Sequence, residues 1–244
     1  MIPSFFLRPK PETRYFPLPN EIFSLGLCAS EFAILAYLFR RASLKLAPPN
    51  LMTVKMNIGV RRNTLKKYVR RLQERGLIAL EHRSRFLPGI VSVRDTIMLT
   101  DALRLRVGHF FPLPSIAFGF GLTVGELAVY GYLLYRENRE TYECWPSCRT
   151  IGDALHMSRN TVMKYVHRLE EKGYITTEPT TVRRMDGTKW NGNLKFRIRP
   201  VHELIEEWNE QETARAERER LRRRAERYAA CYPGLTFTAR NAEP

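Results

Sequence analysis

Seven basic side chains and a single acid fall between positions 61 and 75 of the chain. A helix turns by about 100° per residue, so Leu65, Val69 and Leu72 share one face and most of the cations share the opposite one. One acid cannot neutralise seven cations through i,i+4 pairs, which favours a polyanion over water as their partner. The candidate phosphate and base contacts of this run are Arg61, Arg62, Asn63, Thr64, Lys66, Lys67, Arg70 and Arg71.

A second run, at positions 158–168, has a similar pattern with fewer charges and more varied chemistry. Asparagine can form two hydrogen bonds with adenine, and a methionine side chain can contact the methyl group of thymine. The alternative for Asn160 is a local bond to the helix backbone. The candidate DNA contacts here are Ser158, Arg159, Asn160, Thr161, Met163, Lys164, His167 and Arg168.

These two runs belong to an internal repeat. Phe16-Pro-Leu-Pro19 recurs as Phe111-Pro-Leu-Pro114, and Arg62-Asn-Thr64 recurs as Arg159-Asn-Thr161. Because a sustained repeat indicates duplicated structural units, we expect two copies of one unit, at about 16–100 and 111–200. The connection of about ten residues between them should hold the two basic helices in a fixed relation.

Each copy predicts the same order of elements. An extended proline-containing strand leads to a helix at 28–41 or 123–137, then a short helix near 53–57 or 150–155, then a longer helix at 61–75 or 158–172. Gly76 and Gly173 are placed to end the longer helices. Hairpins follow, with strands expected at 77–82 and 90–99, and at 174–177 and 194–199. The basic residues expected in the hairpin turns suit phosphate or minor-groove contact: Arg83, Arg85, Arg183, Arg184 and Lys189.

The second copy resembles the bacterial winged-helix domains of plasmid and mobile-element proteins, including the N-terminal domain of the replication initiator A family. The resemblance is carried by five segments: Phe111-Pro-Leu-Pro114, Leu122-Thr-Val-Gly-Glu126, Trp145-Pro-Ser147, Ser158-Arg-Asn-Thr-Val162 and Arg168-Leu-Glu-Glu-Lys-Gly-Tyr-Ile175. It implies a sequence-specific double-stranded DNA-binding protein that regulates transcription on a plasmid or mobile element. A replication initiator is one alternative. An accessory subunit, in which one winged helix binds protein, is another.

The expected fold is therefore mainly α with small β-wings, in tandem winged-helix domains. We expect an N-terminal arm at 1–15, domains at 16–100 and 111–200 with a linker at 101–110, a helix at 201–230 and a tail at 231–244. The formal net charge of the chain is +15. Residues 1–110 contribute most of it, with 19 basic and 7 acidic side chains. The first copy of the repeat is thus the expected electrostatic anchor on DNA, and the second copy is expected to discriminate between sequences.

The expected helix at 201–230 differs from both copies. Its apolar residues at 201, 204, 205 and 208 lie on one stripe, and its remainder is rich in Glu, Arg and Ala. Such a helix is laced by i,i+4 pairs and could serve a homodimer or a protein partner, or remain solvated. Within one chain, two fixed units predict a bipartite DNA site of about two turns, whereas a dimer through this helix predicts a palindrome.

Several other classes of protein are disfavoured. The four cysteines are too few for a disulfide framework, and Cys144 with Cys148 lacks a second pair of zinc ligands. No phosphate-binding glycine loop, nucleophile elbow or acidic cluster is present in the sequence, so we expect no enzyme, cofactor or metal. Tyr68 and Tyr165 are expected in the core. The apolar run 115–135 contains Glu126, and the N-terminus does not resemble a signal peptide, which favours a cytoplasmic, nucleoid-associated protein without a membrane partner.

Overall fold

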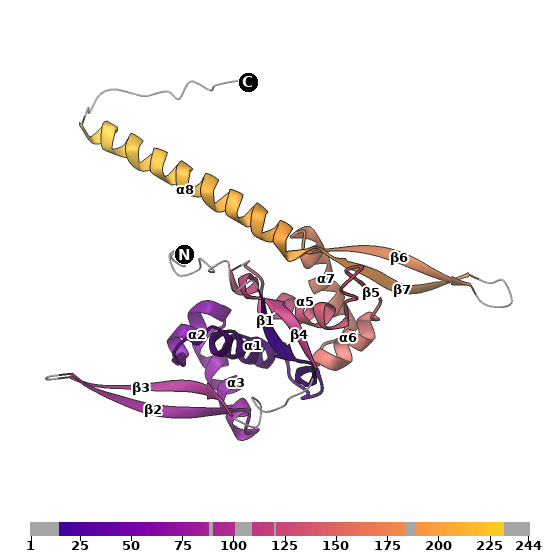
Figure 1. Ribbon diagram of the computed structural model, residues 1–244, viewed down its shortest axis with the longest axis horizontal. Helices are drawn as coiled ribbons and strands as arrows, with labels where there is room; N and C mark the ends of the chain where they lie inside the picture. Colours follow the sequence, from indigo (N-terminus) through magenta and orange to yellow (C-terminus); the bar gives the residue numbers. More distant parts are fainter. Residues whose placement is uncertain (1–14, 88–89, 101–108, 120, 184–188, 232–244) are drawn as a thin grey trace. The chain divides into compact units, whose positions relative to one another are not determined.

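The computed structural model describes residues 15–87, 90–100, 109–119, 121–183 and 189–231 (Figure 1). The chain divides into two compact units, Met1–Arg199 and Pro200–Pro244. The expected N-terminal arm, except for Tyr15, and the residues of the tail beyond Cys231 lie outside the described residues. So do residues 101–108 of the expected linker.

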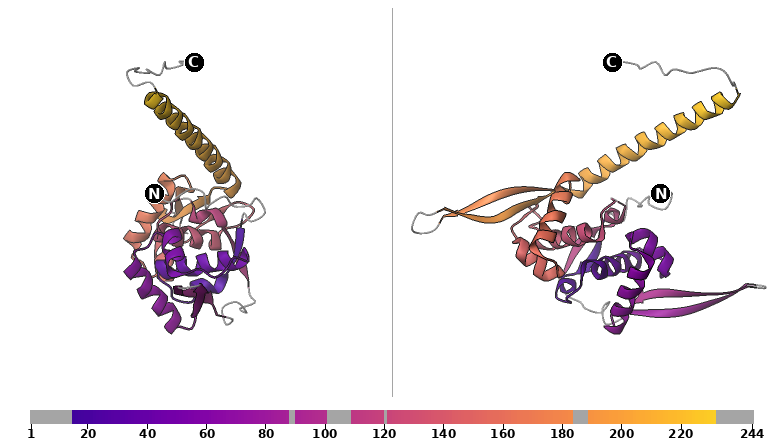
Figure 2. Two further views of the ribbon diagram at one scale, coloured as in Figure 1. Left: turned by 90° about the vertical axis from the view of Figure 1, so that its left-hand side faces the viewer. Right: turned by 180° about the vertical axis from the view of Figure 1, so that it is seen from behind.

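The same order of elements occurs twice in the first unit (Figures 1 and 2). The first set is β1 (Tyr15–Pro19), η2 (Asn20–Phe23), α1 (Ala29–Ser43), α2 (Leu51–Ile58), α3 (Arg62–Glu74), β2 (Ile78–Leu87) and β3 (Ile90–Leu99). The second set is β4 (Phe110–Pro114), η3 (Ser115–Phe118), α5 (Val124–Arg136), β5 (Glu143–Cys144), α6 (Cys148–Leu155), α7 (Arg159–Glu171), β6 (Ile175–Arg183) and β7 (Lys189–Ile198). Helix α8 (Val201–Cys231) follows. The expected fold class, mainly α with small antiparallel sheets, is confirmed.

Local sequence signals set the ends of the helices. The Ser158 hydroxyl accepts a hydrogen bond from the Thr161 amide at 3.2 Å, which begins α7. At the start of α5, Thr123 and Glu126 form a capping box. Helix α3 has Arg61 at its N-cap position, where no side chain caps the helix. Gly76 and Gly173 follow α3 and α7 with φ values of 67° and 72°, a left-handed conformation that glycine adopts without strain.

Helices α1 and α5 form the centre of the first unit. Every residue from Glu31 to Leu38 is buried, and so is every residue from Gly125 to Leu134. Burial extends around both helices. The reason is that α1 packs against α5 as well as against the other helices of its own set. A helix enclosed on all sides is apolar all round.

Strands β1 and β4 join the two sets in a two-stranded antiparallel sheet. Pro17 lies opposite Pro112, and Phe16 lies opposite Leu113. One face of this sheet is buried. The side chains on it are at most 3% exposed: Phe16, Leu18, Phe111 and Leu113. The proline rings tolerate this position because a two-stranded sheet has only edge strands. The two entry strands, which are equivalent in sequence, therefore pair with each other.

Aromatic contacts across the two sets occur in equivalent pairs. The ring of Phe23 lies 5.6 Å from Phe111, and its counterpart Phe118 lies 6.2 Å from Phe16. Phe23 also contacts Tyr132 at 5.1 Å, while Phe118 contacts Tyr37 at 5.5 Å. Each contact is thus repeated with the roles of the two sets exchanged. The two halves consequently meet in an isologous interface, as the subunits of a two-fold symmetric dimer do.

Both hairpins are longer than the sequence predicted. Strand β2 pairs with β3 without a break from Ile78 opposite Leu99 to Leu87 opposite Ile90. Arg83 and Arg85 therefore lie within β2, and their expected place in a turn is wrong. The β-branched residues of β3 favour extended partners throughout this segment. In the second hairpin, Arg183 pairs with Lys189, so the strands β6 and β7 also extend further.

Candidate nucleic-acid interface

Helix α3 presents two distinct faces. Its buried residues are Leu65, Val69 and Leu72, at 1%, 3% and 0% exposure. Tyr68 is half-buried, and the Lys67 and Arg71 cations lie near its ring. The other face is open to solvent over the first turn and along the helix. The exposed candidate residues there are Arg61, Arg62, Asn63, Lys66, Lys67 and Arg70, whereas Thr64 is half-buried.

Helix α7 repeats this division. Val162, Val166 and Leu169 are at most 1% exposed. The solvent-facing candidates are Ser158, Arg159, Asn160, Lys164 and His167, while Thr161, Met163 and Arg168 are half-buried. The side-chain amide of Asn160 forms no hydrogen bond with any described residue, and Ser158 caps the helix. The side-chain cap of α7 is therefore supplied by Ser158 and not by Asn160.

Cys144 and Cys148, the two cysteines considered as zinc ligands, pack in different environments. The Cys148 thiol donates to the sulfur of Met163 at 3.1 Å, which links α6 to α7. Cys144 is 2% exposed, and burial raises the pKa of its thiol to about 12. Among the described residues, no group of three or more potential ligands could hold a metal ion. Met163 is therefore partly engaged within the protein and offers only part of its side chain to a partner.

A buried carboxylate fixes the orientation of α3. Glu31, near the start of α1, is fully buried, and its carboxylate accepts from the Cys28 amide at 2.9 Å. The Arg71 guanidinium lies 3.3 Å from the same carboxylate, and Arg75 lies 3.9 Å from it. Arg75 also donates to the carbonyls of Leu25 and Gly26. These contacts fasten the second half of α3 to α1.

An equivalent carboxylate fastens α7. Glu126 is 1% exposed and accepts from the Thr123 amide at 2.8 Å and from Lys172 at 2.7 Å. Arg168 lies 3.8 Å from its other oxygen. Burial alone would raise the pKa of Glu126, but the hydrogen bonds from Lys172 and Thr123 outweigh it and hold the pKa below its ordinary value. We call the Glu31 and Glu126 arrangements the carboxylate clamps.

The clamps change what Arg71 and Arg168 can do. Both were expected on the DNA face, yet each guanidinium lies against an internal carboxylate while remaining 49% and 43% exposed, respectively. Each carboxylate is shared with a second cation, so the charge on Arg71 and Arg168 is compensated only in part. The sequence held a signal for this arrangement that was missed. The acid and both cations recur in the two copies, as Glu31 with Arg71 and Arg75, and as Glu126 with Arg168 and Lys172.

A glycine brings α5 and α7 together. A Cβ atom at Gly125 would stand 2.2 Å from the ring of Tyr165, so the absence of a side chain lets this ring lie directly on α5. Tyr165 is half-buried there. This packing accounts for the tyrosine at that position in structural terms.

The basic hairpin residues are placed by their strands alone. Arg83 lies opposite Arg94 in the β2–β3 register, a second cation that the sequence analysis did not single out. Arg85 lies opposite Ser92. Arg183 and Lys189 form the last pair of the described β6–β7 ladder, and Arg184 lies outside the described residues. Each hairpin thus carries paired basic positions on its strands.

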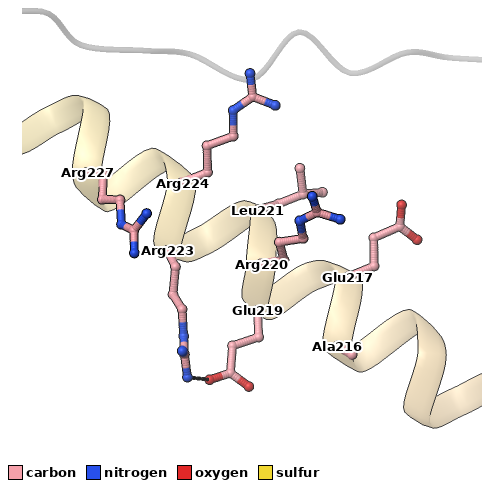
Figure 3. A pocket seen from close by; sticks show the side chains of 8 residues that line it. All are labelled: Ala216, Glu217, Glu219, Arg220, Leu221, Arg223, Arg224 and Arg227. Atoms are coloured by element: carbon pink, nitrogen blue, oxygen red, sulfur yellow. Dashed lines mark hydrogen bonds and ion pairs between the residues drawn. The ribbon is translucent and has the colours of Figure 1, made fainter.

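Helix α8 has segregated charges. Residues 201–214 contain five glutamates and neither lysine nor arginine, whereas residues 215–227 contain seven arginines and three glutamates. Figure 3 shows the arginine-rich stretch, in which Arg223 pairs with Glu219 at 2.6 Å. Arg222 pairs with Glu226 at 2.9 Å, so the expected i,i+4 ion pairs are confirmed. Leu221 and Tyr228 are 58% and 46% exposed.

Comparison with known proteins finds a family match in one part of the chain. Residues 121–175 match the model of a helix-turn-helix domain family, and this segment contains α5, α6 and α7. Among solved structures, the chain is similar to a protein described as a possible transcriptional regulator from Methanosarcina mazei Go1. The identity is 15%, the match covers 44% of this chain and 89% of that one, and the TM-score is 0.30. No curated protein matches the chain. No helix of the described residues is long and apolar enough to cross a membrane.

Proposed function

We propose that this chain is a sequence-specific double-stranded DNA-binding protein that regulates transcription and has no enzymatic activity of its own. One observation carries the proposal. Two equivalent helices, α3 and α7, each have one buried apolar face and one exposed face of basic and amide side chains. The second of them lies in the segment that matches a helix-turn-helix domain. In such domains the exposed helix enters the major groove.

The two helices would divide the work between them. On α3, Lys66, Lys67 and Arg70 form an exposed cationic face that suits phosphates of any sequence. On α7, Asn160 and His167 offer hydrogen-bonding groups that distinguish bases. Basic residues on the two hairpins would contact the adjacent backbone or minor groove. Arg71 and Arg168 act in this scheme as positioning residues, because they hold each helix on its carboxylate clamp.

We assign 16–100 and 111–200 to two tandem winged-helix domains in a cytoplasmic, nucleoid-associated protein. The sequence resemblance supports a plasmid or mobile element as the setting. A replication initiator would use the same DNA-facing residues, and repeated binding sites at an origin would identify it. An operator beside the protein's own gene would identify a regulator.

Helix α8 favours a protein contact over DNA. Its acidic half would be repelled by phosphates, which argues against DNA along its whole length. A second copy of the chain suits the charge pattern, because antiparallel α8 helices would place each acidic half beside an arginine-rich half. Sedimentation of the full chain at low and high salt tests this homodimer. Dimers that weaken as salt rises would support the pairing, and a monomer at all concentrations would contradict it.

DNA binding itself is tested by titrating the full chain against random and selected duplexes at several salt concentrations. We expect Lys67→Gln and Arg70→Gln to weaken binding to every sequence about equally. Each should lower the slope of log K against log salt by roughly one unit, since each removes one phosphate contact. Lys45→Gln is the matched control, because it removes an exposed charge from the turn after α1. Binding that is unaffected by either α3 variant would remove α3 from the interface.

A further inference from the structure

We propose that one chain reads an imperfect inverted repeat, with one half-site under α3 and the other under α7. This inference rests on the proposed DNA binding. It adds the orientation of the two half-sites, the bases they share and the bases at which they differ. None of these follows from the presence of two helix-turn-helix units alone, because tandem units can equally be related by a translation and read direct repeats.

The interface between the two halves supplies the orientation. In the β1–β4 pairing, Phe16 lies opposite Leu113 and Leu18 lies opposite Phe111, with Pro17 opposite Pro112 at the centre. These are equivalent residues of the two copies with their partners exchanged. A local two-fold axis therefore passes between the two prolines, and the reciprocal contacts of Phe23 and Phe118 obey the same axis.

The carboxylate clamps carry this symmetry to the DNA-facing helices. Glu31 on α1 holds α3, and Glu126 on α5 holds α7. Because α1 and α5 also pack on each other, α3 and α7 are both held by one symmetric core. The backbone of a DNA duplex has its own two-fold axes, so readers related by a two-fold axis meet the two strands in opposite directions. The half-sites must then form an inverted repeat.

The first turns of the two helices are chemically the same. Arg62, Asn63 and Thr64 occupy the positions that Arg159, Asn160 and Thr161 occupy in α7. Asn63 and Asn160 are both exposed, and neither side-chain amide bonds to a described residue. The N-terminal residues of a recognition helix contact base edges, and asparagine suits adenine. The two half-sites should therefore share a base pair, an adenine, at symmetric positions.

The following turn makes the repeat imperfect. Lys66 on α3 corresponds to Met163 on α7, and Arg70 corresponds to His167. Lysine and arginine favour guanine or phosphate, whereas a half-buried methionine and a histidine present different chemistry. The bases beyond the shared position should consequently differ between the half-sites. A dimer that placed the same helix on both half-sites would instead read a perfect palindrome.

Selection from random duplexes with the full chain tests the proposal. We expect an inverted pair of unlike half-sites whose centres lie about one helical turn apart. Reversing one half-site, to make a direct repeat at the same spacing, should weaken binding about tenfold or more. A five-base-pair insertion should do the same. Equal binding to the direct repeat would overturn the proposal, and so would full affinity for one half-site alone.

Two matched variants assign the half-sites. Asn160→Ala should relax base preference in one half only, and Asn63→Ala in the other half only. Both side chains are exposed, so neither change should alter folding. If either variant relaxed base preference in both half-sites equally, two chains would each supply the same helix. The proposal that one chain contacts both half-sites would then be wrong. Failure to bind any duplex would instead refute the proposed function itself, a result distinct from binding to DNA in the wrong arrangement.

Discussion

Replacing Glu126 by glutamine tests whether the carboxylate clamp holds α7 in place. The change removes a charge that is 1% exposed and lies 2.7 Å from Lys172 and 3.8 Å from Arg168. Removing one partner of a fully buried pair costs about 3–5 kcal/mol. Here the two cations are 36% and 43% exposed and can be rehydrated, and glutamine still offers an oxygen to the Thr123 amide. We therefore expect a loss of about 2 kcal/mol in the free energy of unfolding.

Thermal unfolding followed by circular dichroism measures this loss. For a compact unit of this size, 1 kcal/mol corresponds to roughly 2–4 °C, so Glu126→Gln should lower Tm by roughly 4–8 °C at pH 7. Glu171→Gln is the matched control, because it removes an exposed charge from α7 and should change stability by no more than about 0.5 kcal/mol.

The pH dependence gives the prediction its sign. The folded-state pKa of Glu126 lies below its ordinary value of 4.5. Its carboxylate therefore contributes stability above that value and loses the contribution as the pH falls through the folded pKa. The difference in Tm between the wild-type chain and Glu126→Gln should be full at pH 7 and should shrink below pH 4.5. The clamp reasoning fails if Glu126→Gln unfolds at pH 7 within the range of the Glu171→Gln control.

Three further predictions follow from individual side chains. Asn160→Ala should lower discrimination at one or two base pairs by about 1–3 kcal/mol, measured by competition between single-base variants of the selected site, and an unchanged preference would make Asn160 irrelevant to recognition. Burial raises the pKa of Glu137 to about 7, so its ionisation increasingly disfavours the folded state as the pH rises from 4.5 to 7. Glu137→Gln should accordingly raise Tm relative to the wild type at pH 8 but not at pH 4.5, and an equal effect at both would contradict this. Gly125→Ala should lower the free energy of unfolding by about 1–3 kcal/mol, measured by chemical denaturation, because the added methyl group meets the Tyr165 ring. The loss should be smaller in a Tyr165→Leu background, and an equal loss there would show that the contact with the ring is not its cause.

Local signals in the sequence were sufficient for the order of the elements. Ser158 and Thr123 are favourable N-cap residues. Gly76 and Gly173 follow helix ends in the left-handed conformation, which glycine adopts without strain. The amphipathic pattern of α3 likewise predicted which of its residues are buried. Leu65, Val69 and Leu72 follow the helical spacing of three or four residues and therefore lie on one face. These features depend on residues within about two helical turns of each other, so no tertiary information is needed.

Contacts between distant residues were not predictable in the same way. Nothing local indicates that Phe16–Pro19 pairs with its own repeat rather than with another strand, because both prolines weaken a strand signal. The clamps join residues about forty positions apart, and no neighbour in the sequence indicates them; only the recurrence of the acid and both cations in the two copies does. The hairpins were underestimated because arginine and serine at positions 83–85 are typical of turns, while their strand conformation is imposed by the partners in β3.

The pairing of β1 with β4 has a consequence for how binding would respond to the amount of protein. A symmetric dimer falls apart on dilution, so its occupancy of DNA drops more steeply than its concentration. Here the two halves are covalently joined, and their mutual effective concentration is set by the chain itself. Dilution should therefore leave α3 and α7 of one chain together on the site, whether or not α8 pairs two chains.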